Sequence, residues 1–183
     1  MRKVLLTGLL ALILSGGAMA YSVGAYANDD PGRGLYLPSD ITLAQAQLAI
    51  EAGLKVAKER GLLMDIAIVD AGGNLKAFVR MNGAFLASVD IAIKKAKTAR
   101  GLNMPTSDLH RAAVPGGELY GIEATNGGMV IFGGGELIKN LEGTIIGAIG
   151  VSGDSVANDT LVAQAGAKAV LKSFMAALKT PKP

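Results

Sequence analysis

The chain has 183 residues, of which 18 are Lys or Arg and 15 are Asp or Glu, so its formal net charge is +3. It contains no cysteine, one histidine and few aromatic residues, while half of its residues are hydrophobic. This composition excludes disulfides, cysteine nucleophiles, cysteine-ligated metal clusters and sites built from several histidines. The small net charge and the shortage of aromatic side chains also argue against nucleic acid as a partner.

The first residues have the composition of an export signal. Arg2 and Lys3 precede an apolar run over residues 4–14, and small residues follow that run. The triplets at residues 18–20 and 25–27 both fit the small-x-small pattern that precedes signal cleavage. We prefer the second triplet because a polar, turn-prone segment begins directly after it.

Residues 1–27 are therefore predicted to be a signal peptide, and the mature chain is predicted to be periplasmic or secreted. An uncleaved membrane anchor is the alternative, but the apolar run is shorter than the roughly 20 residues that span a bilayer. We accordingly expect no stable membrane span once the signal is removed. Removal also takes away two basic residues and no acidic one, which lowers the net charge to +1.

The remainder of the chain is predicted to hold one domain. Residues 28–40 read as an N-terminal arm without periodicity, and residues 41–180 have a length that a single hydrophobic core can organise. The first helix of this domain begins with the capping-box pair Thr42 and Gln45 and ends at Gly61. Its apolar stripe recurs at helical spacing, at Leu43, Ala46, Ile50, Leu54 and Ala57.

A hairpin and a second helix follow. Strands over Met64–Val69 and Leu75–Met81 flank a turn, Asp70–Asn74, whose residues tolerate positive φ. The second helix is predicted over Phe85–Arg100, and its basic residues indicate either a solvated face or a cationic rim for an acidic ligand. These basic residues are Lys94, Lys95, Lys97 and Arg100.

The second half of the chain begins with a long irregular connection, Leu102–Gly128, of a kind that often carries function. Two short strands are predicted after it, over Met129–Phe132 and Glu136–Leu141. A strand over Thr144–Val151 and a helix over Ser155–Lys179 complete the chain.

The strand over Thr144–Val151 is the expected centre of the fold. It is apolar on both faces, which is typical of a strand covered on both sides. Gly147 and Gly150 remove side chains where another element must come close. The order of elements predicts an α+β domain with helices laid against a largely antiparallel, five-stranded sheet.

The single histidine, His110, lies in the irregular connection beside Arg111. An imidazole is a candidate axial ligand for iron, and the neighbouring guanidinium is a candidate partner for an anionic group. The other interpretation is a surface histidine without a function, and spacing alone favours this second interpretation.

Several segments together resemble the GlcG/HbpS family over roughly residues 41–178. The most specific is the run Gly143-x-x-x-Gly147-Ala-Ile-Gly-Val-Ser-Gly153, with Asp159 after it. The chain departs from the family pattern at Glu136, where a proline is expected after the glycine turn. The supporting segments are Met64–Asp70, Gly72–Asn74, Ala92–Ala96, Thr106 after Pro105, Pro115–Gly117 and Gly133–Gly135.

The resemblance implies a profilin-like fold in α/β/α layers, a homo-oligomer, and binding of haem or a related tetrapyrrole in secreted members. Haem degradation is proposed for some members of the family. The family offers no uniform iron ligand, so the assignment of His110 as metal ligand and of Arg111 as cofactor contact depends on their chemistry. Thr106 and Tyr120 are further candidates for contact with the cofactor.

We therefore expect an exported haem-binding protein that takes part in haem sequestration, sensing or degradation. One alternative is a cofactor-free accessory or structural subunit that serves a periplasmic enzyme system. Another is a small-molecule enzyme in which Asp70 or Asp159 acts as general base.

Overall fold

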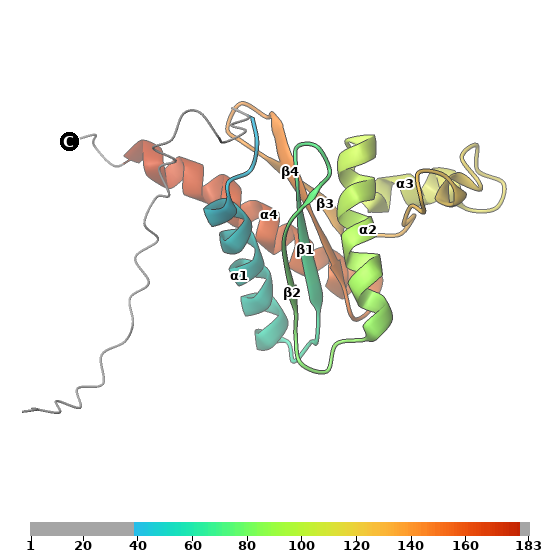
Figure 1. Ribbon diagram of the computed structural model, residues 1–183, viewed down its shortest axis with the longest axis horizontal. Helices are drawn as coiled ribbons and strands as arrows, with labels where there is room; N and C mark the ends of the chain where they lie inside the picture. Colours follow the sequence, from blue (N-terminus) through green and yellow to red (C-terminus); the bar gives the residue numbers. More distant parts are fainter. Residues whose placement is uncertain (1–38, 180–183) are drawn as a thin grey trace, which may run out of the picture.

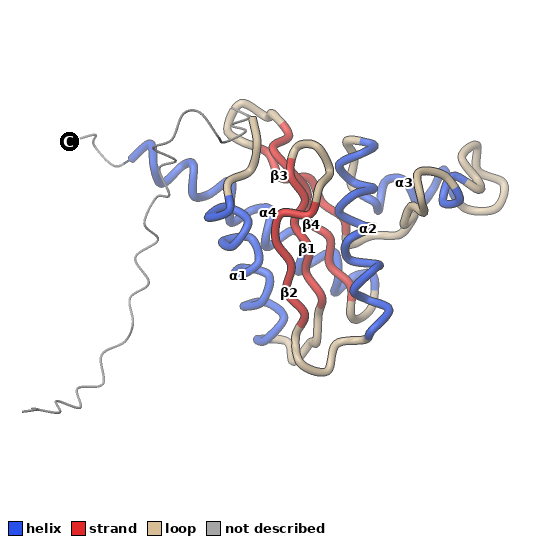
Figure 2. The backbone as a smooth tube through the Cα atoms, viewed as in Figure 1, coloured by secondary structure: helices blue, strands red, loops and turns tan. Residues whose placement is uncertain are grey.

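The structure, a computed structural model, describes residues 39–179 of the chain (Figure 1). The predicted signal peptide, residues 1–27, and almost all of the predicted arm, residues 28–40, lie outside the described residues. The described part contains one antiparallel sheet between two helical layers (Figure 2).

The sheet contains four strands, β1 (Asp65–Asp70), β2 (Leu75–Arg80), β3 (Gly135–Lys139) and β4 (Ile145–Ser152). Their order is β2-β1-β4-β3, and every neighbouring pair is antiparallel. The predicted hairpin is confirmed as β1 and β2, and β4 lies between β1 and β3. The strand that the sequence places at the centre of the fold is therefore central in the sheet.

Helices cover both faces of the sheet. α1 (Leu43–Glu59) and α4 (Val156–Lys179) pack together on one face, and α2 (Leu86–Leu102) covers the other (Figure 1). The predicted α/β/α layering is confirmed. The capping box of α1 is also formed, because Thr42 and Gln45 each donate a backbone N–H to the other's side-chain oxygen, at 2.9 and 3.2 Å.

Among residues 39–179, α4 is the one helix whose length and composition would suffice to cross a membrane. In this structure it forms part of the helical layer beside α1. Val162, Ala163 and Val170 on its inner face are buried in the core cluster that α1, α4 and the sheet share.

The strand sequences explain why both faces of the sheet are covered. In β1, Ile66 and Ile68 point into the core beneath α1 and α4, whereas Ala67 and Val69 point toward α2. Side chains alternate between the faces of a strand, so a run that is apolar throughout has to be covered twice. The α2 side of the core is built largely from alanines, which lets this helix lie close to the sheet.

The prediction of five strands is wrong by one. Met129–Phe132 does not join the sheet, because its backbone is bonded elsewhere. The N–H of Val130 donates to the Thr98 hydroxyl of α2 at 3.0 Å. The segment therefore runs beside α2 and leads into the glycine turn at residues 133–135.

The connection over Leu102–Gly128 is also more regular than predicted. It contains helix α3 (Thr106–Ala113) and a 3₁₀ turn, η1 (Ile122–Ala124). The residue that precedes α3 is Pro105, which makes no side-chain capping bond, so the usual sign of a helix start is missing. With only eight residues, α3 is also too short to show the helical repeat more than about twice.

Candidate ligand-binding site

The four sequence-predicted site residues all lie in the part of the chain that surrounds α3. This part projects from the body of the molecule beside α2 (Figure 1). Thr106 begins α3, while His110 and Arg111 lie in its last turn, where positive charge is favoured by the helix dipole. Tyr120 lies in the loop that follows and is 65% exposed.

His110 has a defined orientation although it is exposed. Its Nδ1 lies 3.2 Å from the carbonyl oxygen of Ile131. A carbonyl only accepts hydrogen bonds, so Nδ1 carries the proton and the neutral ring has its lone pair on Nε2. Histidines that bind metals are commonly held through one ring nitrogen in this way while the other binds the metal. In the neutral ring, Nε2 of His110 is thus the nitrogen that is free to act as a Lewis base.

The other candidates, Arg111 and Thr106, differ in their exposure and in whether their polar groups are already paired. Arg111 is exposed, and among the described residues no carboxylate lies within ion-pair distance of it. Thr106 is buried, and its hydroxyl accepts the N–H of Gly135 at 2.9 Å. Thr106 and His110 are four residues apart and so share a face of α3, which is turned toward residues 131–135.

A cavity of about 260 Å³ lies between α2 and the loop at residues 126–129. Its wall combines apolar side chains from Ile93 and Met129 with two lysines of α2, Lys94 and Lys97. The Lys94 ammonium is 2.8 Å from Asp90, while Lys97 is exposed and has no ion pair with a described residue. The cavity is therefore amphipathic, with an excess of positive charge. Its complete lining is Asp90, Ile93, Lys94, Lys97, Thr98, Asn126, Gly127, Gly128 and Met129.

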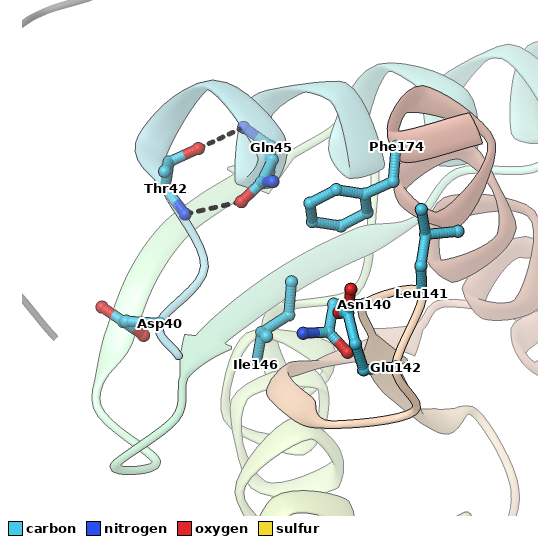
Figure 3. A pocket seen from close by; sticks show the side chains of 8 residues that line it. All are labelled: Asp40, Thr42, Gln45, Asn140, Leu141, Glu142, Ile146 and Phe174. Atoms are coloured by element: carbon cyan, nitrogen blue, oxygen red, sulfur yellow. Dashed lines mark hydrogen bonds between the residues drawn. The ribbon is translucent and has the colours of Figure 1, made fainter. Parts of the chain in front are cut away.

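A second cavity of the same volume lies between the start of α1, the turn that joins β3 to β4, and α4, and its charged residues are acidic (Figure 3). Asp40 and Glu142 line it together with polar groups, and Phe174 of α4 forms part of its wall. Asp40 is already paired with Lys76 at 2.9 Å. An anionic ligand is better matched by the lysine-lined cavity than by this one.

Sequence reasoning misplaced Lys95, which it grouped with the solvent-facing basic residues of α2. Lys95 is fully buried, and its Nζ lies 2.6 Å from Oδ2 of Asp159, which is 2% exposed. Nζ also donates to the carbonyl oxygen of Val151 at 2.9 Å. Burial lowers the pKa of Lys95 and raises that of Asp159, and the attraction between the two charges opposes both shifts.

The spacing along α2 contained a signal for this buried lysine. Ala92, Ala96 and Ala99 define the face of α2 that packs on the sheet, and Lys95 lies on the same face. A lysine within a stripe of alanines predicts a buried ammonium that needs a carboxylate. The sequence could not show that Asp159, 64 residues later, is that carboxylate.

The carboxylates that were considered as general bases are engaged. Oδ1 of Asp70 accepts the N–H groups of Gly72 and Asn74 at 2.9 Å and so closes the hairpin turn. Asp159 binds Lys95 with one oxygen and the N–H of Asp154 with the other. Both residues therefore stabilise local structure.

Glu136, where a proline is expected from the family pattern, lies in the edge strand β3. Its carboxylate accepts a hydrogen bond from Gln164 of α4 at 3.2 Å. Burial raises the pKa of Glu136, the bond from Gln164 opposes the rise, and the charge of Asp108 adds to it. The side chain thus lies between α4 and α3 without disturbing the glycine turn before it.

Comparison with known proteins agrees with this architecture. A family model described as "Haem degrading protein HbpS-like" matches residues 41–168. The chain belongs to this family. An uncharacterised 15.0 kDa protein of Citrobacter freundii is 40% identical over 124 residues, which are 68% of this chain and 87% of that protein. The corrinoid adenosyltransferase PduO of the same organism is 38% identical over 120 residues, which are 65% of this chain but only 36% of the enzyme.

Solved structures of family members share the fold. A complex of PduOC with haem superimposes with a TM-score of 0.68 at 34% identity, covering 71% of this chain and 94% of that one. A double mutant of HbpS from Streptomyces reticuli superimposes with a TM-score of 0.66 at 31% identity, covering 76% and 92% of the two chains. The profilin-like fold that the resemblance implies is therefore the fold of this family.

Proposed function

We propose that this protein binds haem or a related tetrapyrrole on the surface between α3 and α2, with Nε2 of His110 as a ligand of the iron. The observation that carries the proposal is the hydrogen bond from His110 to the Ile131 carbonyl. That bond leaves the exposed nitrogen in its metal-binding form. Membership of the HbpS-like family and the haem complex of a relative support the choice of ligand.

The residues near His110 provide positive charge for the propionate groups of a haem. Its propionates require cations or water, and Arg111 is adjacent to His110 in the sequence. Met129 lines the lysine-lined cavity and lies two residues before Ile131. Lys94 and Lys97 are therefore close to the segment whose carbonyl orients the imidazole. Bound haem would supply the redox-active iron, while these residues hold and orient it.

The volume of the cavity constrains how such a ligand would lie. Pockets that enclose a drug-sized molecule have volumes of about 300–1,000 Å³, and 260 Å³ is below this range. A tetrapyrrole ring would therefore lie along the surface with an acidic group in the cavity. Sequestration, sensing and degradation of haem all begin with this binding step.

We also propose that the protein acts outside the cytoplasm and as a homo-oligomer. The export pattern in residues 1–27 supports the first statement. Exposed apolar side chains on the described surface, among them Phe85, Leu86 and Leu178, support the second because they are candidates for burial between copies.

Titration of the chain with haem tests the proposed binding. We expect saturation at a fixed ratio of haem to chain or oligomer, with a Soret band shifted from that of free haem. His110→Ala should change the band position, whereas Arg111→Ala should weaken affinity and leave the band nearly fixed.

An unchanged spectrum in His110→Ala would remove this residue as the ligand. Tyr120, Thr106 and the methionines would then be the next candidates. Uptake of haem without saturation would contradict the proposal itself and favour the accessory-subunit interpretation.

A further inference from the structure

A buried ion pair lies directly behind the segment that orients His110. Lys95 comes from α2 and Asp159 from α4, and these helices cover opposite faces of the sheet. The two side chains meet beside Gly134, the residue before β3. A Cβ on Gly134 would lie 2.7 Å from the Lys95 ammonium and 2.9 Å from Cβ of Asp159. A side chain at this position would therefore crowd the ion pair.

The ion pair contacts residues 132–134 at several points. The ammonium of Lys95 lies 4.9 Å from the centre of the Phe132 ring, a distance suited to a cation–π interaction. Val151, whose carbonyl accepts from Lys95, donates its own N–H to the carbonyl of Gly134 at 2.8 Å. Residues 132–134 are thus held against Lys95 by a ring contact and a shared backbone partner.

The same segment holds α3 at two points. The N–H of Gly135 donates to the hydroxyl of Thr106, and the carbonyl of Ile131 accepts from His110. Thr106 and His110 are one helical turn apart, and their partners are four residues apart in the segment. The orientation of the imidazole therefore depends on where residues 131–135 lie, and these lie against Lys95 and Asp159.

We propose that the Lys95–Asp159 pair positions His110: it fixes residues 131–135 and, through the Ile131 carbonyl, holds the imidazole in its Nδ1–H tautomer. In functional terms the inference rests on the proposed role of His110 as iron ligand. Buried ion pairs generally add little stability compared with apolar residues of similar size, so a positional role explains this one better than a stabilising role. Neither residue touches the ligand.

The test uses the fact that His110 is the only histidine of the chain. The ring ¹⁵N chemical shifts of the haem-free chain report its tautomer without ambiguity. We expect the Nδ1–H form to predominate in the wild type. In the double variant Lys95→Met with Asp159→Leu, which removes both charges together, we expect a mixture of tautomers. A matched control, Lys55→Met with Glu59→Gln, removes an exposed ion pair of α1 and should leave the tautomer unchanged.

A second variant covers the case in which the double variant does not fold. Thr106→Val keeps the shape of the side chain but removes the acceptor for Gly135, so it loosens the same segment from α3. It should also give mixed tautomers. If each variant that folds retains the pure Nδ1–H form, the proposal is overturned.

Haem titration of the same variants separates the two proposals. With the positioning role and the proposed function both correct, the variants with mixed tautomers should also show a shifted Soret band. A tautomer change in a chain that binds no haem would support the positioning role and refute the function. If the variants keep the pure Nδ1–H tautomer and His110→Ala alters the haem spectrum, the proposed function is supported and the positioning role is refuted.

Discussion

Replacing Gly150 by alanine should destabilise the protein, because α2 lies directly over this point of β4. A Cβ there would collide with the carbonyl of Ala92 and would lie 2.5 Å from the backbone nitrogen of Ala96. Both obstacles are helix backbone, which does not move aside as a flexible side chain would. Ordinary contact begins at 3.4 Å, so α2 would have to retreat by more than 1 Å along its interface with the sheet.

Overpacking of this kind costs about 1–3 kcal/mol, and occasionally more. For a domain of this size, 1 kcal/mol corresponds to a change in melting temperature of about 2–4 °C. We therefore expect the melting temperature of Gly150→Ala to fall by roughly 2–12 °C, measured by circular dichroism or calorimetry.

The matched control is Gly101→Ala. Gly101 lies in α2, has no positive φ, and its added Cβ would meet no atom within 4 Å. A helical glycine replaced by alanine usually stabilises by about 0.5–1 kcal/mol, so this variant should melt higher than the wild type. Equal melting temperatures for the two variants would show that α2 does not press on β4 as described.

Further predictions concern charge, ligand affinity and assembly. Burial raises the pKa of Asp65, whose carboxylate has no hydrogen-bond partner among the described residues. The contribution of Asp65 to the free energy of unfolding should therefore be greatest below the unfolded pKa of about 3.9 and be lost as pH rises through the folded pKa. Asp65→Asn should therefore stabilise the protein by about 1–3 kcal/mol at pH 7, with the gain vanishing near pH 4; a gain independent of pH would contradict this. Replacing Lys94 and Lys97 by alanine should weaken haem affinity roughly two- to thirtyfold, because exposed ion pairs contribute about 0.2–1 kcal/mol each. The same change at Lys168 and Lys172 of α4 should have no effect. Light scattering should give a mass several times that of one chain, and a monomer at micromolar concentration would refute the proposed assembly.

The parts of the fold that could be predicted depend on neighbours in the sequence. The capping box at Thr42 and Gln45, the turn closed by Asp70, and the apolar run of β4 all express interactions within a few residues or one strand. Local interactions of this kind leave a pattern that can be read without the fold. The resemblance to the GlcG/HbpS family supplied the layering and the expected ligand class.

The features that could not be predicted join residues far apart. Val130 donates its N–H to the Thr98 hydroxyl of α2 and not to a strand, so the apolar segment Met129–Phe132 looks like a strand in sequence but is not one. The alanine stripe of α2 indicates that Lys95 is buried, but nothing in the sequence indicates that Asp159 is its partner. In both cases the partner of a polar group is chosen by packing, and the residues nearby in the sequence do not show which partner it will be.

His110 could be predicted in part from the sequence, but its orientation depends on a distant residue. Its isolation as the only imidazole, next to Arg111 and in a chain without cysteine, singles it out from composition alone as a candidate metal ligand. Whether its ring has a defined orientation depends on a carbonyl 21 residues away, at Ile131. A backbone carbonyl is present at every residue, so no sequence pattern marks the one that is used. Only the packing of residues 131–135 against α2, α3 and α4 brings that carbonyl to Nδ1 and leaves Nε2 with its lone pair.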